Sequence, residues 1–343
     1  MEGSPLSEMN RQFLLVRRPR GEPVPDDFRL ASTPLPQPTP GSFILRNHFA
    51  SLDPAQRGWM DDRPSYMPPI ALGQPVRATT VGRVHASANP DFAPGDWVLG
   101  LNALEDYSVA APGGFTTKVD VSRLPSPSYL LSALGAVGLT GYFGLLEVGR
   151  PHPGETVLVT GAAGAVGSVV GQIARIKGCR TIGIAGGAAK CQRLLQDYHF
   201  DVAIDYRGKS VKQLSAEIGA AAGGGVDIIF ENVGGEILEA GLNNLAPRAR
   251  VILCGLISEY NSEEKRGARN LWQLIVRRAT IHGFLIMDYV PRFAEGGAQI
   301  AAWIGEGRLR IDEHIERGLE NAYPAFMKLF SGGNIGKMVL QIA

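Results

Sequence analysis

Apolar residues recur in short, uninterrupted runs after residue 153, and longer stretches with helical spacing separate these runs. A continuous apolar run is typical of a strand that is buried on both faces of a parallel sheet, with helices as the crossover connections. The predicted strands are Thr156–Thr160, Arg180–Ile184, Asp227–Phe230 and Arg250–Cys254, and the clearest predicted helix is Val166–Lys177. The pattern predicts a doubly wound α/β domain.

The first part of the chain has a different character, because 20 of the 23 prolines lie at or before Pro153. Proline disfavours helix interiors and central strands, so short strands and loops are expected there. Near residue 340 a Gly-rich turn precedes a predicted last strand, Lys337–Ile342, which could return to the first domain.

Composition limits the classes of protein that the chain can represent. With 343 residues, 45% hydrophobic residues and a net charge of +1, it is typical of a globular protein of about two domains. The balanced charge argues against binding to nucleic acid or to an anionic membrane surface. Three cysteines without a Cys-x-x-Cys pair favour a reducing, cytoplasmic compartment.

One uncharged segment, residues 129–146, reaches the lower limit of membrane-spanning length. Four glycines at three-residue spacing interrupt it, so we predict a buried, tightly packed helical segment and no membrane span. The N-terminal 20 residues also lack the apolar stretch of a signal peptide.

The strongest local motif is Gly161-Ala-Ala-Gly-Ala-Val-Gly167, which lies between the first predicted strand of the α/β domain and its helix. Small residues allow a sharp turn and a close approach to a pyrophosphate, while the helix N-terminus offers N–H groups to the anion. The usual first glycine of Gly-x-Gly-x-x-Gly is replaced by Ala162. The position of the motif predicts a dinucleotide site.

The end of the second predicted strand bears on the choice of cofactor. NAD sites usually place a carboxylate there to bind the ribose hydroxyls, whereas this chain continues Ile184-Ala-Gly-Gly-Ala-Ala-Lys190. Lys190 is either a partner for the 2′-phosphate of NADPH or a solvated lysine at a helix start. Tyr206 either flanks the same phosphate or covers the sheet edge.

Several motifs together resemble a known family, the zinc-independent medium-chain dehydrogenases/reductases of the prostaglandin, alkenal and curcumin reductase group. They span nearly the whole chain and include Ser51-Leu-Asp-Pro-Ala-Gln-Arg-Gly-Trp-Met60, Gly138-Leu-Thr-Gly-Tyr-Phe-Gly-Leu-Leu-Glu147, Gly161-Ala-Ala-Gly-Ala-Val-Gly-Ser168, Glu231-Asn-Val-Gly-Gly235, Cys254-Gly-Leu-Ile-Ser-Glu-Tyr-Asn261 and Gly332-Gly-Asn-Ile-Gly-Lys337.

The resemblance implies two domains: a Rossmann doubly wound parallel sheet over residues 129–313, and a GroES-like β-barrel domain over residues 1–128 that is completed by residues 314–343. It also implies NADPH as cofactor, a homodimer, and Lys190 and Tyr206 as contacts of the 2′-phosphate. The cofactor positions that it implies are Ala163, Gly164, Ala165, Val166, Gly167, Lys190, Tyr206, Asn232, Cys254, Gly255, Ile257, Ser258, Tyr260, Phe284, Leu285, Ile286 and Asn334.

No metal site is predicted. Zinc-dependent relatives carry a Gly-His-Glu motif where this chain has Leu72-Gly-Gln-Pro75, and no His-Glu-x-x-His spacing occurs. Reduction of an isolated carbonyl without a metal needs another electrophile. A conjugated enone needs less help, because hydride transfer to its β-carbon leaves a delocalised enolate.

Tyr260 is the candidate catalytic donor, since it follows the predicted strand Arg250–Cys254 and ligands of doubly wound sheets lie beyond the carboxyl ends of the strands. A phenol of ordinary pKa, about 10, is protonated at neutral pH and can donate to the enolate; the alternative is that Tyr260 only packs against the nicotinamide ribose. Tyr66 and Met67 either line a substrate cleft or pack in a surface loop.

The leading hypothesis is therefore an NADPH-dependent reductase of the carbon–carbon double bond of small hydrophobic α,β-unsaturated ketones and aldehydes. An NADPH-dependent quinone oxidoreductase is the alternative enzyme. An NADPH-binding sensor without turnover is the alternative from a different class.

Overall fold

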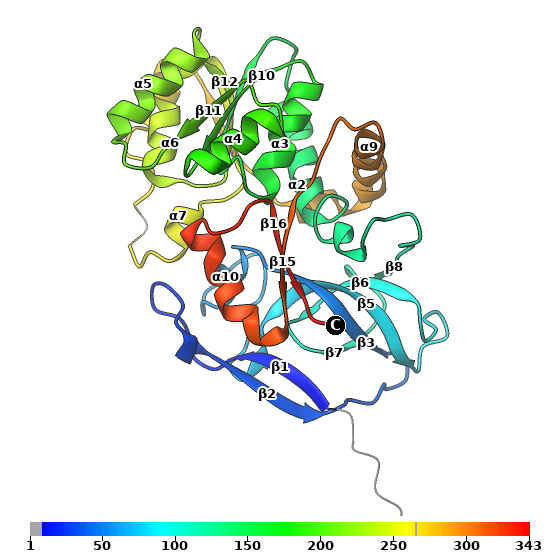
Figure 1. Cartoon of the computed structure of the whole chain (residues 1–343). Coiled ribbons are helices and arrows are strands. Elements are labelled where there is room, and N and C mark those ends of the chain that lie inside the picture. The colour runs from blue at the N-terminus through cyan, green and yellow to red at the C-terminus, as the bar shows by residue number, and fades with distance from the viewer. Residues whose placement is uncertain (1–8, 265) are drawn as a thin grey trace, which may run out of the picture. The chain divides into compact units, whose positions relative to one another are not determined.

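The computed structural model describes residues 9–264 and 266–343, which divide into two compact units. Unit 1 comprises the chain up to Leu131, together with His314–Ser331 and Met338–Ala343. Unit 2 comprises Ser132–Glu313 and Gly332–Lys337. The chain thus leaves unit 2 after residue 313, returns to it for six residues and ends in unit 1 (Figure 1).

Unit 2 holds, in its described residues, a six-stranded parallel sheet in the order β11-β10-β9-β12-β13-β14. Its strands are β9 (Thr156–Val159), β10 (Arg180–Ala185), β11 (Val202–Asp205), β12 (Val226–Glu231), β13 (Leu245–Leu253) and β14 (Thr280–Gly283). Its helices are α2 (Ala136–Phe143), α3 (Ala165–Ile176), α4 (Ala188–Gln196), α5 (Val211–Ala222), α6 (Gly235–Leu242), α7 (Ile257–Tyr260), α8 (Trp272–Arg277) and α9 (Phe293–Gly305). This is the predicted doubly wound, Rossmann-type arrangement.

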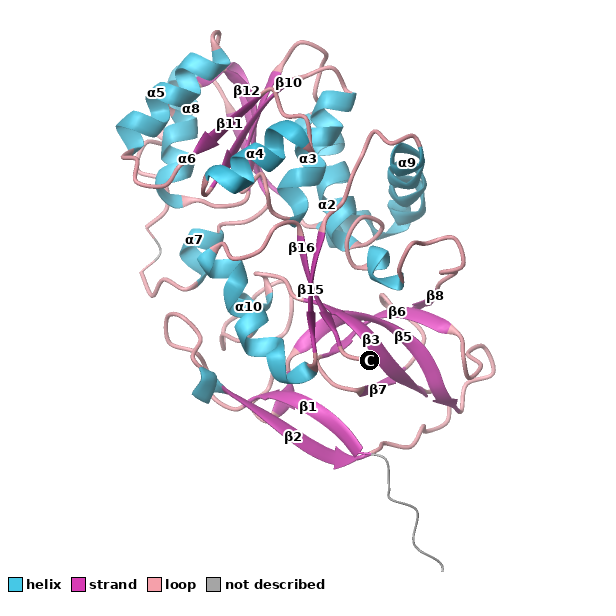
Figure 2. Cartoon of the chain, viewed as in Figure 1, coloured by secondary structure: helices cyan, strands magenta, loops and turns pink. Residues whose placement is uncertain are grey.

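Helices cover both faces of this sheet (Figure 2). On one face α5, α6 and α8 pack through a cluster of buried apolar side chains that includes Leu158, Ile182, Leu214 and Leu238. On the other face α2 and α3 pack together, because Gly141 brings α2 close to the side chains of Val169 and Val170. Burial on both faces explains why the inner strands, β9, β10, β12 and β13, read as continuous apolar runs.

The uncharged segment at 129–146 is helical only in its second part. A 3-10 turn covers Pro127–Leu130, and α2 begins at Ala136, since Gly135 is extended and caps it. A wider π-type turn continues α2 over Gly144–Gly149. Within the described residues, no helix combines the length and the apolar character needed to cross a bilayer.

Unit 1 is built on antiparallel pairing, as expected for its short strands. One sheet has the order β2-β1-β4, and a second has the order β15-β16-β3-β5-β6-β8, with β7 paired to β3. The strands are β1 (Met9–Leu15), β2 (Phe28–Pro34), β3 (Phe43–Ser51), β4 (Gln74–Pro75), β5 (Arg77–Ser87), β6 (Trp97–Ala103), β7 (Tyr107–Ala110), β8 (Thr117–Lys118), β15 (Glu313–Arg317) and β16 (Lys337–Gln341), and the helices are α1 (Gln56–Trp59) and α10 (Ala322–Ser331).

The last strand closes unit 1 from the C-terminal side. Residues Val339–Gln341 of β16 pair antiparallel with β3, and Met338 and Leu340 join a buried core that also contains Phe13 and Phe326. The last strand thus pairs with a strand from the first part of the chain.

Candidate cofactor and active site

The Gly-rich turn joins β9 directly to α3. Gly161 has φ +58°, which favours glycine, and the N–H of Gly164 donates to its carbonyl oxygen at 2.9 Å. A Cβ on Gly167 would lie 2.8 Å from the Cα of Ala162 and nearer still to the oxygen of Gly161, so α3 packs on the turn backbone. The helix thereby begins at the sheet edge, where its first-turn N–H groups lack helical partners and can bind an anion.

Asn334 lies beside this turn although it is far away in sequence. Gly336 forms a parallel bridge with Gly164 and donates its N–H to the oxygen of Ala163 at 3.0 Å. The buried Asn334 side chain donates to the oxygen of Gly336, also at 3.0 Å. The segment 332–337 is thus part of the wall of the dinucleotide turn.

The carboxyl ends of β12 and β13 bring Asn232 and Tyr260 together. The Asn232 amide donates to the carbonyl oxygen of Thr160 at 2.7 Å, which ties β12 to β9. The Tyr260 hydroxyl accepts the N–H of Leu256 at 3.2 Å and lies 3.1 Å from the position of a Cβ on Gly255. A phenol oxygen can accept one hydrogen bond while its proton is donated elsewhere, so this arrangement is compatible with a donor role.

Glu231 is a functional candidate that the sequence analysis missed. Its fully buried side chain accepts three hydrogen bonds on Oε1: from the Thr160 hydroxyl at 2.8 Å, the N–H of Val233 at 2.6 Å and the N–H of Gly234 at 2.7 Å. Burial raises the pKa of this carboxyl. Oε2 has no hydrogen-bond partner among the described residues. Glu231 therefore holds the loop that follows β12 in place. In the sequence, only its position directly after the predicted strand Asp227–Phe230 could have indicated this structural role.

Cys254 lies at the end of β13 next to that carboxyl. Burial, and then the charge of Glu231, raise the pKa of the Cys254 thiol to about 12. The thiol is therefore protonated at neutral pH and is a poor nucleophile.

The remaining predicted cofactor residues also follow the sheet strands. In α7, after β13, the Ser258 hydroxyl donates to the oxygen of Val233 at 2.7 Å. Phe284, Leu285 and Ile286 follow β14, and the Phe284 ring lies edge-on to Phe230 with the ring centroids 6.4 Å apart.

The end of β10 forms a second Gly-rich turn, before α4. Asp205, at the end of the neighbouring β11, accepts the N–H groups of Gly187 at 2.8 Å and Arg207 at 3.0 Å. Tyr206 and Arg207 lie over Gly186, within 3.2 Å of the position of its missing Cβ. The turn is therefore contacted by an acid from the neighbouring strand, Asp205. Arg207 is a third candidate residue at this turn, in addition to the two predicted ones, Lys190 and Tyr206.

Tyr66 and Met67 belong to unit 1. The Tyr66 side chain is exposed and its hydroxyl accepts the indole N–H of Trp59 at 3.1 Å, while Met67 is half-buried.

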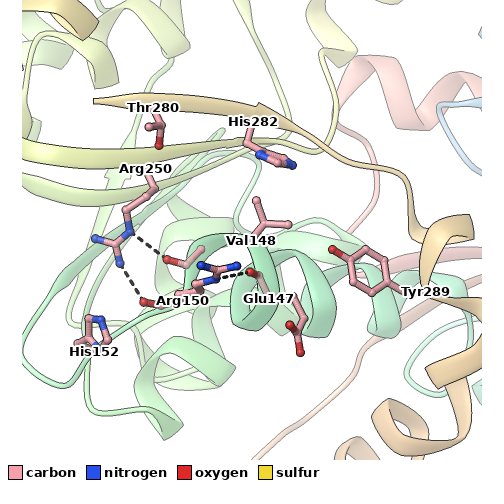
Figure 3. A pocket seen from close by; sticks show the side chains of 9 residues that line it. Glu147, Val148, Arg150, His152, Arg250, Thr280, His282 and Tyr289 are labelled. Carbon is pink, nitrogen blue, oxygen red and sulfur yellow. Dashed lines mark hydrogen bonds between the residues drawn. The ribbon is translucent and has the colours of Figure 1, made fainter. Parts of the chain in front are cut away.

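A separate pocket of about 550 Å³ lies in unit 2 along β13 and β14 (Figure 3). Arg250 lines this pocket. Its guanidinium forms two 2.7 Å hydrogen bonds to Glu155 and also donates to the carbonyl oxygens of Gly149 and Arg150 at 3.0 Å. None of the predicted site residues lines this pocket. The parts of the chain that are described contain no group of three or more His, Cys, Asp and Glu side chains placed to hold a metal ion.

Two family models match the chain in the order expected from the fold. One is described as the N-terminal domain of oxidoreductase and matches residues 11–119. The other, described as zinc-binding dehydrogenase, matches residues 165–302.

Full-length relatives decide the assignment. The chain is 39% identical over 342 residues to the NADPH-dependent curcumin reductase of Escherichia coli (98% of each chain covered). It is 36% identical over 338 residues to the NADP-dependent 2-alkenal reductase of Nicotiana tabacum (97% of this chain and 98% of the relative). The chain belongs to the zinc-independent medium-chain dehydrogenases/reductases.

A solved structure from this family supports the same conclusion. CurA of Vibrio vulnificus in complex with NADPH has a TM-score of 0.91 and 39% identity, and the match covers 97% of this chain and 99% of CurA. The family thus accounts for both the parallel sheet of unit 2 and the antiparallel sheets of unit 1.

Proposed function

We propose that this protein is an NADPH-dependent reductase of the carbon–carbon double bond of α,β-unsaturated ketones and aldehydes. The observation that carries the proposal is the position of the Tyr260 hydroxyl. It lies over Gly255, just beyond the carboxyl end of β13, and the dinucleotide turn follows β9 at the same edge of the parallel sheet. The activities that name the relatives, curcumin and 2-alkenal reduction, support this substrate class.

Unit 2 is the proposed cofactor domain and unit 1 the proposed substrate domain. The turn fits a pyrophosphate, because a side chain at Gly167 would collide with backbone and the first N–H groups of α3 face the turn. Residues 163–167, Asn232 and Asn334 are proposed to hold the dinucleotide, with Lys190 and Tyr206 at its 2′-phosphate. Tyr66 and Met67 are proposed to contact the apolar part of the substrate.

NADPH supplies the hydride that reduces the β-carbon of the substrate. The chain's own contribution is a hydrogen-bond donor for the oxygen on which negative charge develops, and Tyr260 is that donor in our proposal. The protonated Cys254 thiol also suits this chemistry, since a thiolate near an electrophilic enone would add to it.

The test is the oxidation of NADPH with a panel of enones, alkenals and quinones, followed at 340 nm. We expect turnover with 3-nonen-2-one and with alkenals. Turnover with quinones alone would favour the quinone oxidoreductase, and tight NADPH binding without turnover on the whole panel would favour a sensor.

The variant Tyr260→Phe tests the donor. Loss of one such donor costs about 2.7–4 kcal/mol of transition-state stabilisation, which lowers kcat by roughly 100- to 1000-fold. The dissociation constant of NADPH should change far less than kcat, because phenylalanine keeps the aromatic ring. Tyr323→Phe is the matched control, because that phenol donates to the oxygen of Pro23 in unit 1; an equal effect of both variants on kcat would contradict the role of Tyr260.

We also propose a cytoplasmic homodimer. The last strand of the parallel sheet, β14, has four exposed residues and an open edge, and α8 next to it exposes Trp272 and Ile275, each at 67%. An open edge beside apolar side chains is a typical site of chain–chain pairing. The three free cysteines of the described residues suit a reducing compartment.

A further inference from the structure

Two cations, Lys190 and Arg207, lie at the turn that follows β10. Lys190 is half-buried, and burial, followed by the positive charge of Arg207, lowers its pKa. Within residues 9–264 and 266–343, neither the ammonium of Lys190 nor the guanidinium of Arg207 forms an ion pair or a hydrogen bond. Two unneutralised cations that close together disfavour the empty site and favour an anion between them.

Asp205, at the end of the neighbouring strand, is bonded to backbone N–H groups and not to either cationic side chain. Asp205 uses Oδ1 to accept the N–H groups of Gly187 and Arg207, and these two hydrogen bonds lower its pKa, so it is ionised at neutral pH. The carboxylate is thereby tied to the backbone of the turn on one of its two oxygens. Lys209, two residues on, is paired with Glu217 at 2.5 Å and is not available either.

The Arg207 guanidinium can lie over the turn because the two residues there, Gly186 and Gly187, have no side chains. Its Nε is 3.0 Å from the position of a Cβ on Gly186, and its Nη1 is 2.9 Å from the position of a Cβ on Gly187. A larger residue at either glycine would push the guanidinium away from the turn. Gly187 also has φ +95°, which a side chain disfavours.

From this geometry we propose that Arg207 is a specificity-determining residue that binds the 2′-phosphate of NADPH together with Lys190, and that Asp205 positions it. The inference rests on the proposed use of NADPH and deepens it. A guanidinium can form two parallel hydrogen bonds to a phosphate, whereas an ammonium acts as a point charge. Lys190 supplies the second charge needed by a phosphomonoester dianion.

Calorimetric titration of the full chain with NADPH, NADH and 2′,5′-ADP tests this assignment. In Arg207→Gln, we expect the dissociation constants of NADPH and 2′,5′-ADP to rise by roughly 10- to 100-fold, the range expected for hydrogen bonds to a charged group. The constant for NADH, which has no 2′-phosphate, should change less than about twofold. Arg207→Lys should weaken binding of the 2′-phosphate less than Arg207→Gln does. Lysine keeps the positive charge but cannot form the two parallel hydrogen bonds of a guanidinium.

Lys209→Gln is the matched control, as it removes a cation two residues away that is already paired. Unchanged NADPH binding in Arg207→Gln, or equal weakening of NADPH and NADH, would overturn the assignment, and so would a wild-type protein that does not prefer NADPH. These readouts need no turnover: failure of enone reduction with selective 2′,5′-ADP binding would refute the proposed reaction and leave the role of Arg207 intact.

Discussion

Replacing Gly167 by alanine probes the contact on which the dinucleotide turn depends. The new Cβ would lie 2.8 Å from the Cα of Ala162, whereas ordinary van der Waals contact begins at 3.4 Å. Both neighbours that it meets, Ala162 and the carbonyl oxygen of Gly161, present backbone atoms that cannot rotate away. The start of α3 must therefore move outward from the end of β9.

The cost follows from two opposing effects. Overpacking of this kind costs about 1–3 kcal/mol, while alanine is better than glycine in a helix by about 0.5–1 kcal/mol. We expect a net loss of roughly 1–2 kcal/mol in the free energy of unfolding, and a fall in Tm of about 2–8 °C. Displacement of the first N–H groups of α3 should also weaken NADPH binding by roughly 10- to 100-fold.

Urea and thermal unfolding followed by circular dichroism, without nucleotide, measure the first effect, and calorimetric titration with NADPH measures the second. Gly297→Ala is the matched control, since Gly297 lies inside α9 of the same unit and its Cβ would meet no atom within 4 Å. That variant should be more stable than wild type by about 0.5–1 kcal/mol. Wild-type stability and NADPH affinity in Gly167→Ala would refute the packing explanation of the motif.

Two further predictions concern other parts of the chain. Ile281→Lys places a charge on the open edge of β14 and should convert the proposed dimer to a monomer, as measured by light scattering coupled to size exclusion. The control is Ile315→Lys on β15, an equally exposed isoleucine of another edge strand, which should leave the dimer intact. A dimer in both variants would place the interface elsewhere. Partial burial alone would raise the pKa of Glu155, but the hydrogen bonds from Arg250 and His152 outweigh it and lower that pKa. The resulting stability is present above the ordinary pKa of about 4.5 and is lost as pH falls through the lowered value. Glu155→Gln should therefore cost about 1–3 kcal/mol at pH 7 and progressively less in urea titrations below pH 4.5, and a cost that does not change with pH would contradict the role of this ion pair.

The four inner strands of the parallel sheet, β9, β10, β12 and β13, could be predicted because helices cover both of their faces. Each predicted apolar run became a strand with bounds shifted by at most five residues: the second is Arg180–Ala185, and the fourth begins five residues earlier than predicted, at Leu245. The break before α2 could not be predicted from hydrophobicity, since it depends on the extended backbone of Gly135 rather than on a change in polarity.

Contacts between neighbouring strand ends were harder to predict than the motifs themselves. The turn from residue 161 to 167 has a local signature, but Glu231 acts through Thr160 on another strand, and Asp205 reaches a turn that contains no acid of its own. Arg207 was overlooked because its guanidinium lies over two glycines that precede it in the chain by a whole helix and strand. Such relations depend on strand order, which the spacing of residues does not give.

The bridge between Gly164 and Gly336 has a consequence for biosynthesis. The wall of the nucleotide turn is supplied by residues that leave the ribosome long after β9 and α3 have been made. A nascent chain can therefore form most of the parallel sheet during translation, but it cannot complete its nucleotide-binding turn until residues 332–337 have emerged.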